Sequence, residues 1–287
     1  MRRRNVTDKW TTGYADMTTA RFTACRTNML GGLIYAVGNS SGTSPTTNEA
    51  YDPVSDTWVG KAAYPNTIVA YCVVSVGDYL IGAGGSWLTT NYKYTRRYTP
   101  SSNSWSNRTD MPTARDTMAG AVVDGKIYVM GGYLRGSGTY VNANEMYDNV
   151  ANTWTAKTDM PTARYGLAVI ASLGKIYAIG GYTSANVQTN EEFDPVNNSW
   201  ASKANMTTAR NAFDGAWVDG FIYCIGGDSG GNVDVNERYD PVTNTWTTKT
   251  DMPTTRRGMG CAVYGGKIYV IGGYTTSEIK KVEVYEP

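Results

Sequence analysis

Arginine and glutamate recur at matched positions along this chain of 287 residues. Counted back from a recurring Gly-Gly pair, five segments place an arginine at the start of an apolar run, and five place a glutamate two residues before an aromatic residue. The arginines are Arg21, Arg115, Arg164, Arg210 and Arg256, and the glutamates are Glu49, Glu145, Glu191, Glu237 and Glu283. One segment lacks both and carries Ile68 and Arg96 instead.

A charge in the interior of a protein needs a partner to offset its lost hydration. The joint loss therefore predicts that each arginine pairs with the glutamate of its own segment and that these ten residues are structural. The alternative is a ring of arginines that binds an anion.

Residues suited to catalysis are scarce, because the sequence contains no histidine. This excludes Ser-His-Asp and Cys-His nucleophilic sites and histidine-ligated zinc, copper or iron. No carboxylate pair stands out for acid/base work, since Asp116 and Asp228 are single. We expect no catalytic residues, no metal and no cofactor.

The charge balance restricts the possible partners. Lys plus Arg number 26 and Asp plus Glu number 25, which argues against a protein that binds nucleic acid or an anionic membrane. No apolar stretch approaches the roughly 20 residues that span a bilayer. The N-terminus also lacks the apolar core of a signal peptide. We expect a cytoplasmic monomer.

Six tryptophans set the period of the chain, at intervals of 46 to 49 residues: Trp10, Trp58, Trp105, Trp154, Trp200 and Trp246. The sequence DMPTAR occurs at 110–115 and 159–164, and DMPTTR at 251–256. Each is followed by KIY-x-x-GG. Repeats of this length are typical of solenoids and propellers.

The repeat at 162–203 predicts four antiparallel strands, at 164–172, 175–179, 191–194 and 199–203, because short apolar runs alternate with Gly, Asn and Pro turns. Six such units around an axis form a β-propeller. Glycine and alanine in the first strand indicate that backbones approach closely near the axis. The tryptophan of the fourth strand and the tyrosine of the second are expected to pack between adjacent sheets.

The two ends of the chain are out of phase with the repeat. The chain starts with a fourth strand around Trp10 and finishes with a third strand around Tyr285. We predict that these strands pair, which closes the ring and satisfies their exposed edges. Residues 5–287 would then form one domain, with 1–4 as a flexible end.

Four cysteines (Cys25, Cys72, Cys224 and Cys261) lie in different repeats without C-x-x-C spacing. We expect buried thiols. A Cys25–Cys261 bridge stays open as an alternative, because ring closure would make their repeats neighbours.

These motifs resemble those of the kelch family. The residues that carry the resemblance are the double glycines (131–132, 180–181, 226–227, 272–273), Tyr-Asp-Pro (51–53, 239–241) and the tryptophan that follows. Gly38-Asn39 and Thr99 depart from the pattern. The resemblance implies a six-bladed kelch propeller, a fold that commonly binds protein segments.

Variation between the repeats is concentrated on one side of the predicted ring, in the loops between strands two and three and in the residues that follow each inner arginine. Loops on a rigid scaffold are where binding normally resides. The candidate binding residues are Trp87, Tyr133, Leu134, Arg135, Tyr140, Tyr182, Tyr274, Phe22, Asp116, Tyr165, Asn211 and Arg257.

We therefore expect a non-catalytic scaffold that binds a protein or peptide through this loop face. The alternatives are an enzyme of the sugar epimerase or mutarotase type, a glycan-binding adhesin, and an isolated scaffold without intrinsic activity. One repeat fold hosts many unrelated sites, so the repeat alone does not choose among them.

Overall fold

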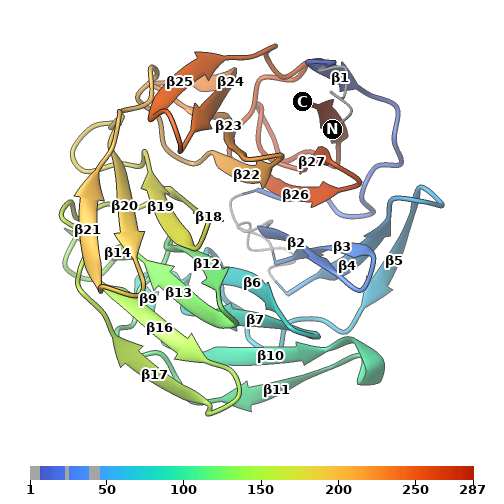
Figure 1. Ribbon diagram of the computed structural model, residues 1–287. Coiled ribbons are helices and arrows are strands. Elements are labelled where there is room, and N and C mark those ends of the chain that lie inside the picture. Colours follow the sequence, from blue (N-terminus) through green and yellow to red (C-terminus); the bar gives the residue numbers. More distant parts are fainter. Residues whose placement is uncertain (1–6, 23–25, 39–45) are drawn as a thin grey trace.

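The repeat folds into six four-stranded antiparallel sheets, arranged as blades around a central axis (Figure 1). This computed structural model describes residues 7–22, 26–38 and 46–287. In that part of the chain the one helix is a 3-10 turn, η1 (Pro100–Ser102), and no helix has the length and apolar character to cross a membrane. The predicted all-β, six-bladed propeller is confirmed.

Each blade runs from an inner strand at the axis to an outer strand at the rim. Blade 1 contains β2 (Arg26–Leu30), β3 (Leu33–Val37), β4 (Asn48–Asp52) and β5 (Thr57–Lys61). Blade 2 contains β6 (Cys72–Val76), β7 (Tyr79–Ala83), β10 (Thr95–Thr99) and β11 (Ser104–Arg108). Blade 3 contains β12 (Ala119–Val123), β13 (Lys126–Met130), β16 (Asn144–Asp148) and β17 (Thr153–Ala156).

The second half of the chain repeats this order. Blade 4 contains β18 (Ala168–Ser172), β19 (Lys175–Ile179), β20 (Asn190–Asp194) and β21 (Ser199–Ser202). Blade 5 contains β22 (Asp214–Val218), β23 (Phe221–Asp228), β24 (Asn232–Asp240) and β25 (Thr245–Thr248). Blade 6 contains β26 (Gly260–Tyr264), β27 (Lys267–Ile271), β28 (Val282–Glu286) and β1 (Lys9–Thr11).

Blade 6 is built from both ends of the chain, as the phase of the repeat predicted (Figure 1). Strand β1 pairs antiparallel with β28, and Trp10 lies opposite Tyr285. An apolar cluster between blades 6 and 1, which includes Tyr51 and Val284, completes the set of interfaces between neighbouring blades. The ring is therefore closed by pairing as well as by packing.

The inner strands approach one another as closely as their small residues predicted. A Cβ atom at Gly215 would lie 2.2 Å from the carbonyl oxygen of Tyr223 and 2.8 Å from Cδ1 of Ile170 in the neighbouring blade. The predicted start of the inner strand at 164 was wrong, because β18 begins at Ala168. The left-handed φ of +64° at Gly166 interrupts the extended run before it.

The loop between the second and third strands folds differently in different blades. It forms the hairpin β8 (Ser86–Trp87) with β9 (Thr90–Asn91) in blade 2, and β14 (Tyr133–Leu134) with β15 (Thr139–Tyr140) in blade 3. In blade 5 the hairpin is a continuation of β23 and β24 across a register shift. These hairpins stand on the loop face and shape its rim.

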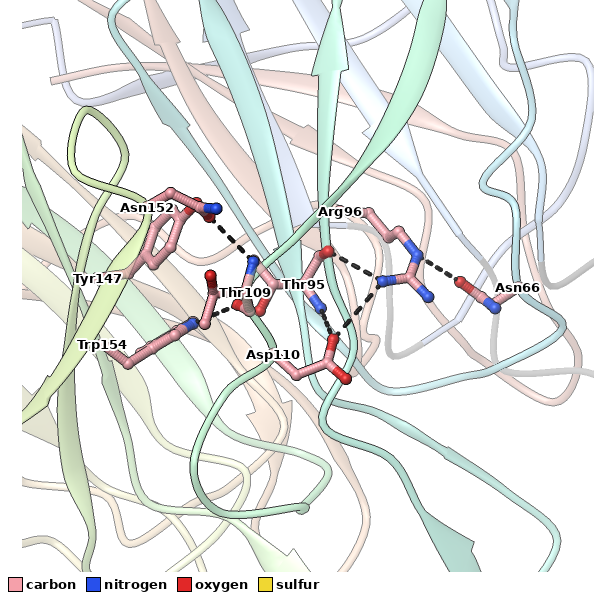
Figure 2. Close-up of polar contacts among 8 residues, drawn as sticks. All are labelled: Asn66, Thr95, Arg96, Thr109, Asp110, Tyr147, Asn152 and Trp154. Carbon is pink, nitrogen blue, oxygen red and sulfur yellow. Dashed lines mark hydrogen bonds and ion pairs between the residues drawn. The ribbon is translucent and has the colours of Figure 1, made fainter.

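Neighbouring blades are joined by a repeated staple, which Figure 2 shows between blades 2 and 3. The indole Nε1 of Trp154 donates to the carbonyl oxygen of Thr109 at 2.9 Å, and the N–H of Thr109 donates to Oδ1 of Asn152 at 2.9 Å. The hydroxyl of Tyr147 donates to the same Oδ1 at 2.8 Å. Asn152 accepts both bonds from a left-handed conformation, with φ at +57°. The prediction that the tryptophans pack between sheets is confirmed.

Candidate functional site

Two sets of variable positions meet at the loop-face end of the central channel. In five blades the residue after the inner arginine, or after Ile68 in blade 2, forms a β-bridge with the residue after the double glycine. We call these couples the mouth pairs: Val69–Ser86, Asp116–Tyr133, Tyr165–Tyr182, Asn211–Asp228 and Arg257–Tyr274. Each of these blades therefore places two adjacent residues at the mouth, of which Ser86 and Asp116 are completely buried.

Directly below the mouth pairs, a chain of backbone hydrogen bonds crosses from blade to blade. The N–H of Thr117 donates to the carbonyl of Ala70 at 2.9 Å, and the N–H of Gly166 to the carbonyl of Thr117 at 3.0 Å. Ala212 and Gly258 continue the series at 2.8 and 2.7 Å. All five residues have positive φ, between +50° and +64°. We call these five residues the belt.

A cavity of about 490 Å³ lies above the belt, which forms its floor. We call it the mouth cavity. Five of the predicted binding residues line it, together with residues that the sequence analysis did not select as binding residues. The predicted ones are Phe22, Tyr165, Tyr182, Asn211 and Arg257, and the others used below are Asn186, Asp228 and Gly230.

Tyrosine rings of blade 4 form one side of the mouth cavity, and tyrosine rings of blade 3 pack behind them. Tyr165 lies 5.4 Å from Tyr182, 5.3 Å from Tyr133 and 5.8 Å from Tyr140, measured between ring centroids. Burial raises the pKa of Tyr165, so its hydroxyl stays protonated and can donate a hydrogen bond. Tyr133 and Tyr140 do not line the cavity, but they support the two rings that do.

The opposite side of the mouth cavity holds an ion pair against aromatic rings. Nη1 of Arg257 donates to Oδ2 of Asp228 at 2.5 Å, and the N–H of Gly230 donates to the other carboxylate oxygen at 2.9 Å. The guanidinium lies 5.5 Å from the ring centre of Phe22 and 5.1 Å from that of Tyr274. Between the two sides, Nδ2 of Asn211 donates to Oδ1 of Asn186 at 2.6 Å.

Arg135 holds the rim in place and does not line the cavity. Its Nε contacts the completely buried carboxylate of Asp116 and donates to Oγ of Ser86 at 2.8 Å. Its backbone N–H donates to Oδ1 of Asn91 at 2.7 Å, and Nδ2 of Asn91 donates to the carbonyl of Tyr133 at 3.1 Å. These bonds fasten the blade 2 hairpin to the blade 3 hairpin.

Trp87 and Leu134 lie on the same hairpins, outside the mouth cavity. Trp87 packs against the apolar cluster between blades 1 and 2. Asn91 and Asn186 were missed from sequence, because asparagine is common in these loops and only the fold shows which one turns inward.

The predicted pairs of inner arginine and glutamate all form, one in each of five blades. The five arginines are completely buried, so their charges are not presented to the cavity. In blade 2, Nε of Arg96 instead donates to Oδ1 of Asn66 at 2.9 Å, and the guanidinium lies 3.7 Å from the carboxylate of Asp110 (Figure 2). Blade 2 therefore also neutralises its buried arginine, but with partners from other sequence positions.

The described cysteines and carboxylates are scattered over the fold. In the ranges that the structure describes, no three His, Cys, Asp or Glu residues gather in a group that could hold an ion. Cys72, Cys224 and Cys261 are buried, and burial raises the pKa of the Cys224 thiol. The alternative bridge involves Cys25, which lies outside the described residues.

Three Kelch-like proteins are similar in sequence to parts of this chain. Kelch-like protein 36 of Rattus norvegicus is 28% identical over 127 residues, 42% of this chain and 21% of that protein. Kelch-like protein 23 of Mus musculus is 27% identical over 192 residues, 49% of this chain and 33% of that protein. Kelch-like ECH-associated protein 1A of Danio rerio is 32% identical over 104 residues, 35% of this chain and 17% of that protein. The chain spans a third or less of the length of these relatives.

A solved structure and a family model cover more of the chain. The solved structure of YjhT superposes with a TM-score of 0.83 at 15% identity, over 94% of this chain and 96% of that one, which shows a shared fold. The family model described as the KLHDC2/KLHL20/DRC7 Kelch-repeats domain matches residues 70–273. With its double glycines, blade tryptophans and six closed blades, the chain belongs to the kelch-repeat family.

Proposed function

We propose that this propeller is a non-catalytic binding module that receives a segment of a partner protein in the mouth cavity. Kelch propellers commonly mediate protein interactions. The observation that carries the proposal is the position of the cavity. Its polar walls come from mouth pairs of blades 4 to 6 and from variable loops, whereas the blades below them repeat. A binding site is expected to concentrate sequence variation in the loops around the cavity, because loops can vary while packing holds the blades rigid.

The chemistry of the walls supports the same proposal. Tyrosine, asparagine and arginine supply many of the polar side chains that line the cavity, beside apolar residues such as Phe22 and Phe213. Tyrosine gives large contact area at a low cost in conformational entropy, and tyrosine and arginine dominate the energetics of protein interfaces. The volume of about 490 Å³ lies within the range of known ligand pockets.

Glycan recognition is the second candidate, favoured by one specific arrangement. The ring of Tyr165 and the hydrogen-bonded amides of Asn186 and Asn211 line the same cavity. A flat ring next to amide groups can contact both the C–H face and the hydroxyl groups of a sugar.

The test is selection of peptides from a phage-displayed random library on the immobilised protein. Binding of the selected peptides is then measured by fluorescence anisotropy for the unchanged protein, Tyr165→Ala and Trp217→Ala. Trp217 is a matched aromatic control, 43% exposed at the opposite end of the channel. We expect Tyr165→Ala to weaken binding at least about 30-fold, as for an interface hot spot, and Trp217→Ala to have no effect.

Equal binding of the selected peptides to the unchanged protein and to Tyr165→Ala would contradict the proposal. So would a failure to select any peptide. The protein is also tested on a glycan array. A glycan that binds the unchanged protein but not Tyr165→Ala would favour the second candidate.

A further inference from the structure

The side chains around the mouth cavity offer more hydrogen-bond donors than acceptors. Arg257, whose side chain is 32% exposed, uses Nη1 on Asp228, and within the described residues its Nε and Nη2 have no partner. Asn186 uses its Oδ1 on Asn211 and leaves its Nδ2 unused. The hydroxyls of Tyr165 and Tyr182 likewise have no hydrogen-bond partner in the described ranges, and both line the cavity.

The charged and backbone acceptors of the cavity are largely occupied already, and Oδ1 of Asn211 is the side-chain amide oxygen that the described residues leave without a partner. Both carboxylate oxygens of Asp228 accept hydrogen bonds, one from Gly230 and one from Arg257. In the floor, the belt carbonyls of Ala70, Thr117, Gly166 and Ala212 accept from the next blade. A ligand N–H that descends towards this floor would lose its water without gaining a partner, which is costly.

Charge is balanced both in the cavity and at its rim. Asp228 neutralises Arg257 at 2.5 Å, and Arg135 neutralises the buried Asp116 at the rim. An anionic ligand that approaches Arg257 therefore also meets the carboxylate of Asp228, and a cation that approaches Asp228 meets the guanidinium. The mouth is complementary to an uncharged ligand that is rich in acceptors.

From this balance we infer that the bound segment is uncharged and presents proline to the mouth cavity. Proline has no backbone N–H, and its carbonyl remains an acceptor for Arg257 and Asn186. Its ring can pack on Tyr165 and Tyr182, in the way that proline-rich segments dock on aromatic surfaces in other folds. The inference rests on the proposed function and specifies the chemistry of the segment.

The experiment compares two phage libraries panned in parallel on the whole protein, one fully random and one with a proline fixed at the centre. Selected peptides are resynthesised with each proline replaced by alanine, and with a single aspartate or lysine placed beside it. Dissociation constants are measured by fluorescence anisotropy for the unchanged protein, Tyr165→Ala and the control Trp217→Ala.

We expect proline without flanking charge to be enriched even from the random library. Replacement of the central proline by alanine is expected to weaken binding at least about tenfold, because it adds an unpartnered N–H. Aspartate and lysine should each weaken binding, and Tyr165→Ala should remove the difference between proline and alanine peptides.

Peptides that depend on Tyr165 but carry no proline, or that bind more tightly with an added charge, would overturn this inference and leave the proposed function standing. Peptides that bind Tyr165→Ala as well as the unchanged protein would overturn both. A protein that selects no peptide from either library would also refute both.

Discussion

Removal of one partner from a buried Arg–Glu pair should strongly destabilise the propeller, and blade 4 offers the cleanest case. Nη1 of Arg164 donates to Oε2 of Glu191 at 2.6 Å, and the two side chains are 0% and 4% exposed. Burial lowers the pKa of Arg164, and Glu191 opposes that shift because its carboxylate stabilises the charged guanidinium. Glu191→Leu leaves this charge buried without a counterion.

The expected loss of stability is about 3–5 kcal/mol, the range for breaking a buried pair. In a chain of this size that corresponds to a decrease in Tm of roughly 6–10 °C. The assay is thermal unfolding followed by circular dichroism, with urea unfolding as a second measure. The control is Lys175→Ala, which removes the partly exposed pair with Asp194 in the same blade and should cost about 1 kcal/mol or less.

A double variant separates charge from packing. Arg164→Met with Glu191→Leu removes both charges and fills similar volume, so it should be more stable than Glu191→Leu alone. The reasoning is refuted if Glu191→Leu unfolds within about 1 kcal/mol of the unchanged protein, or if the double variant is no more stable than the single one.

Three further predictions concern the seam, the staple and the inner strands. Burial opposes ionisation of Asp8, but hydrogen bonds from Tyr285, Thr250 and Lys249 lower its pKa from 3.8 to about 2. The ionised carboxylate therefore stabilises the closed ring above pH 4, and this stabilisation is lost as the pH falls towards 2. The Tm difference between the unchanged protein and Asp8→Asn should shrink over that interval, and a constant difference would contradict the prediction. Asn152→Ala should lower the free energy of unfolding in urea by about 2–3 kcal/mol, because two hydrogen bonds are lost and alanine disfavours the left-handed φ. Asn152→Asp keeps the accepting oxygen and should be tolerated. If the two variants lose the same stability, the staple does not act as described. Gly215→Ala should lower the Tm by several degrees, because its Cβ would lie 2.2 Å from a carbonyl oxygen, and an unchanged melt would show that the inner strands have room.

The periodic features of the fold could be predicted from the sequence because each one recurs in several repeats, so that an interpretation made in one repeat can be compared with the others. Joint loss of arginine and glutamate in one repeat predicted ion pairs that the structure forms. The phase of the termini predicted the pairing of Trp10 with Tyr285. Both inferences use comparison between repeats, in which a position that departs from the pattern reveals its partner.

The candidate site was less accessible to this reasoning, because its residues are those that do not repeat. Phe22, Tyr165 and Arg257 were selected as variable positions and line the cavity. Arg135 was selected for the same reason, yet it is held by Asp116 and Ser86 at the rim. Its loop pattern gave no indication of which neighbour it would contact.

The amino-acid sequence by itself determined the number of blades, the strands within them and the closure of the ring, since hydrophobic periodicity and glycine turns are local signals repeated six times. Only the tertiary structure decided which loop residues meet above the belt. Ring closure brings Phe22 to Arg257 and Tyr274 across most of the chain length. Such contacts depend on the rotation between blades and on side-chain direction, which no local pattern encodes.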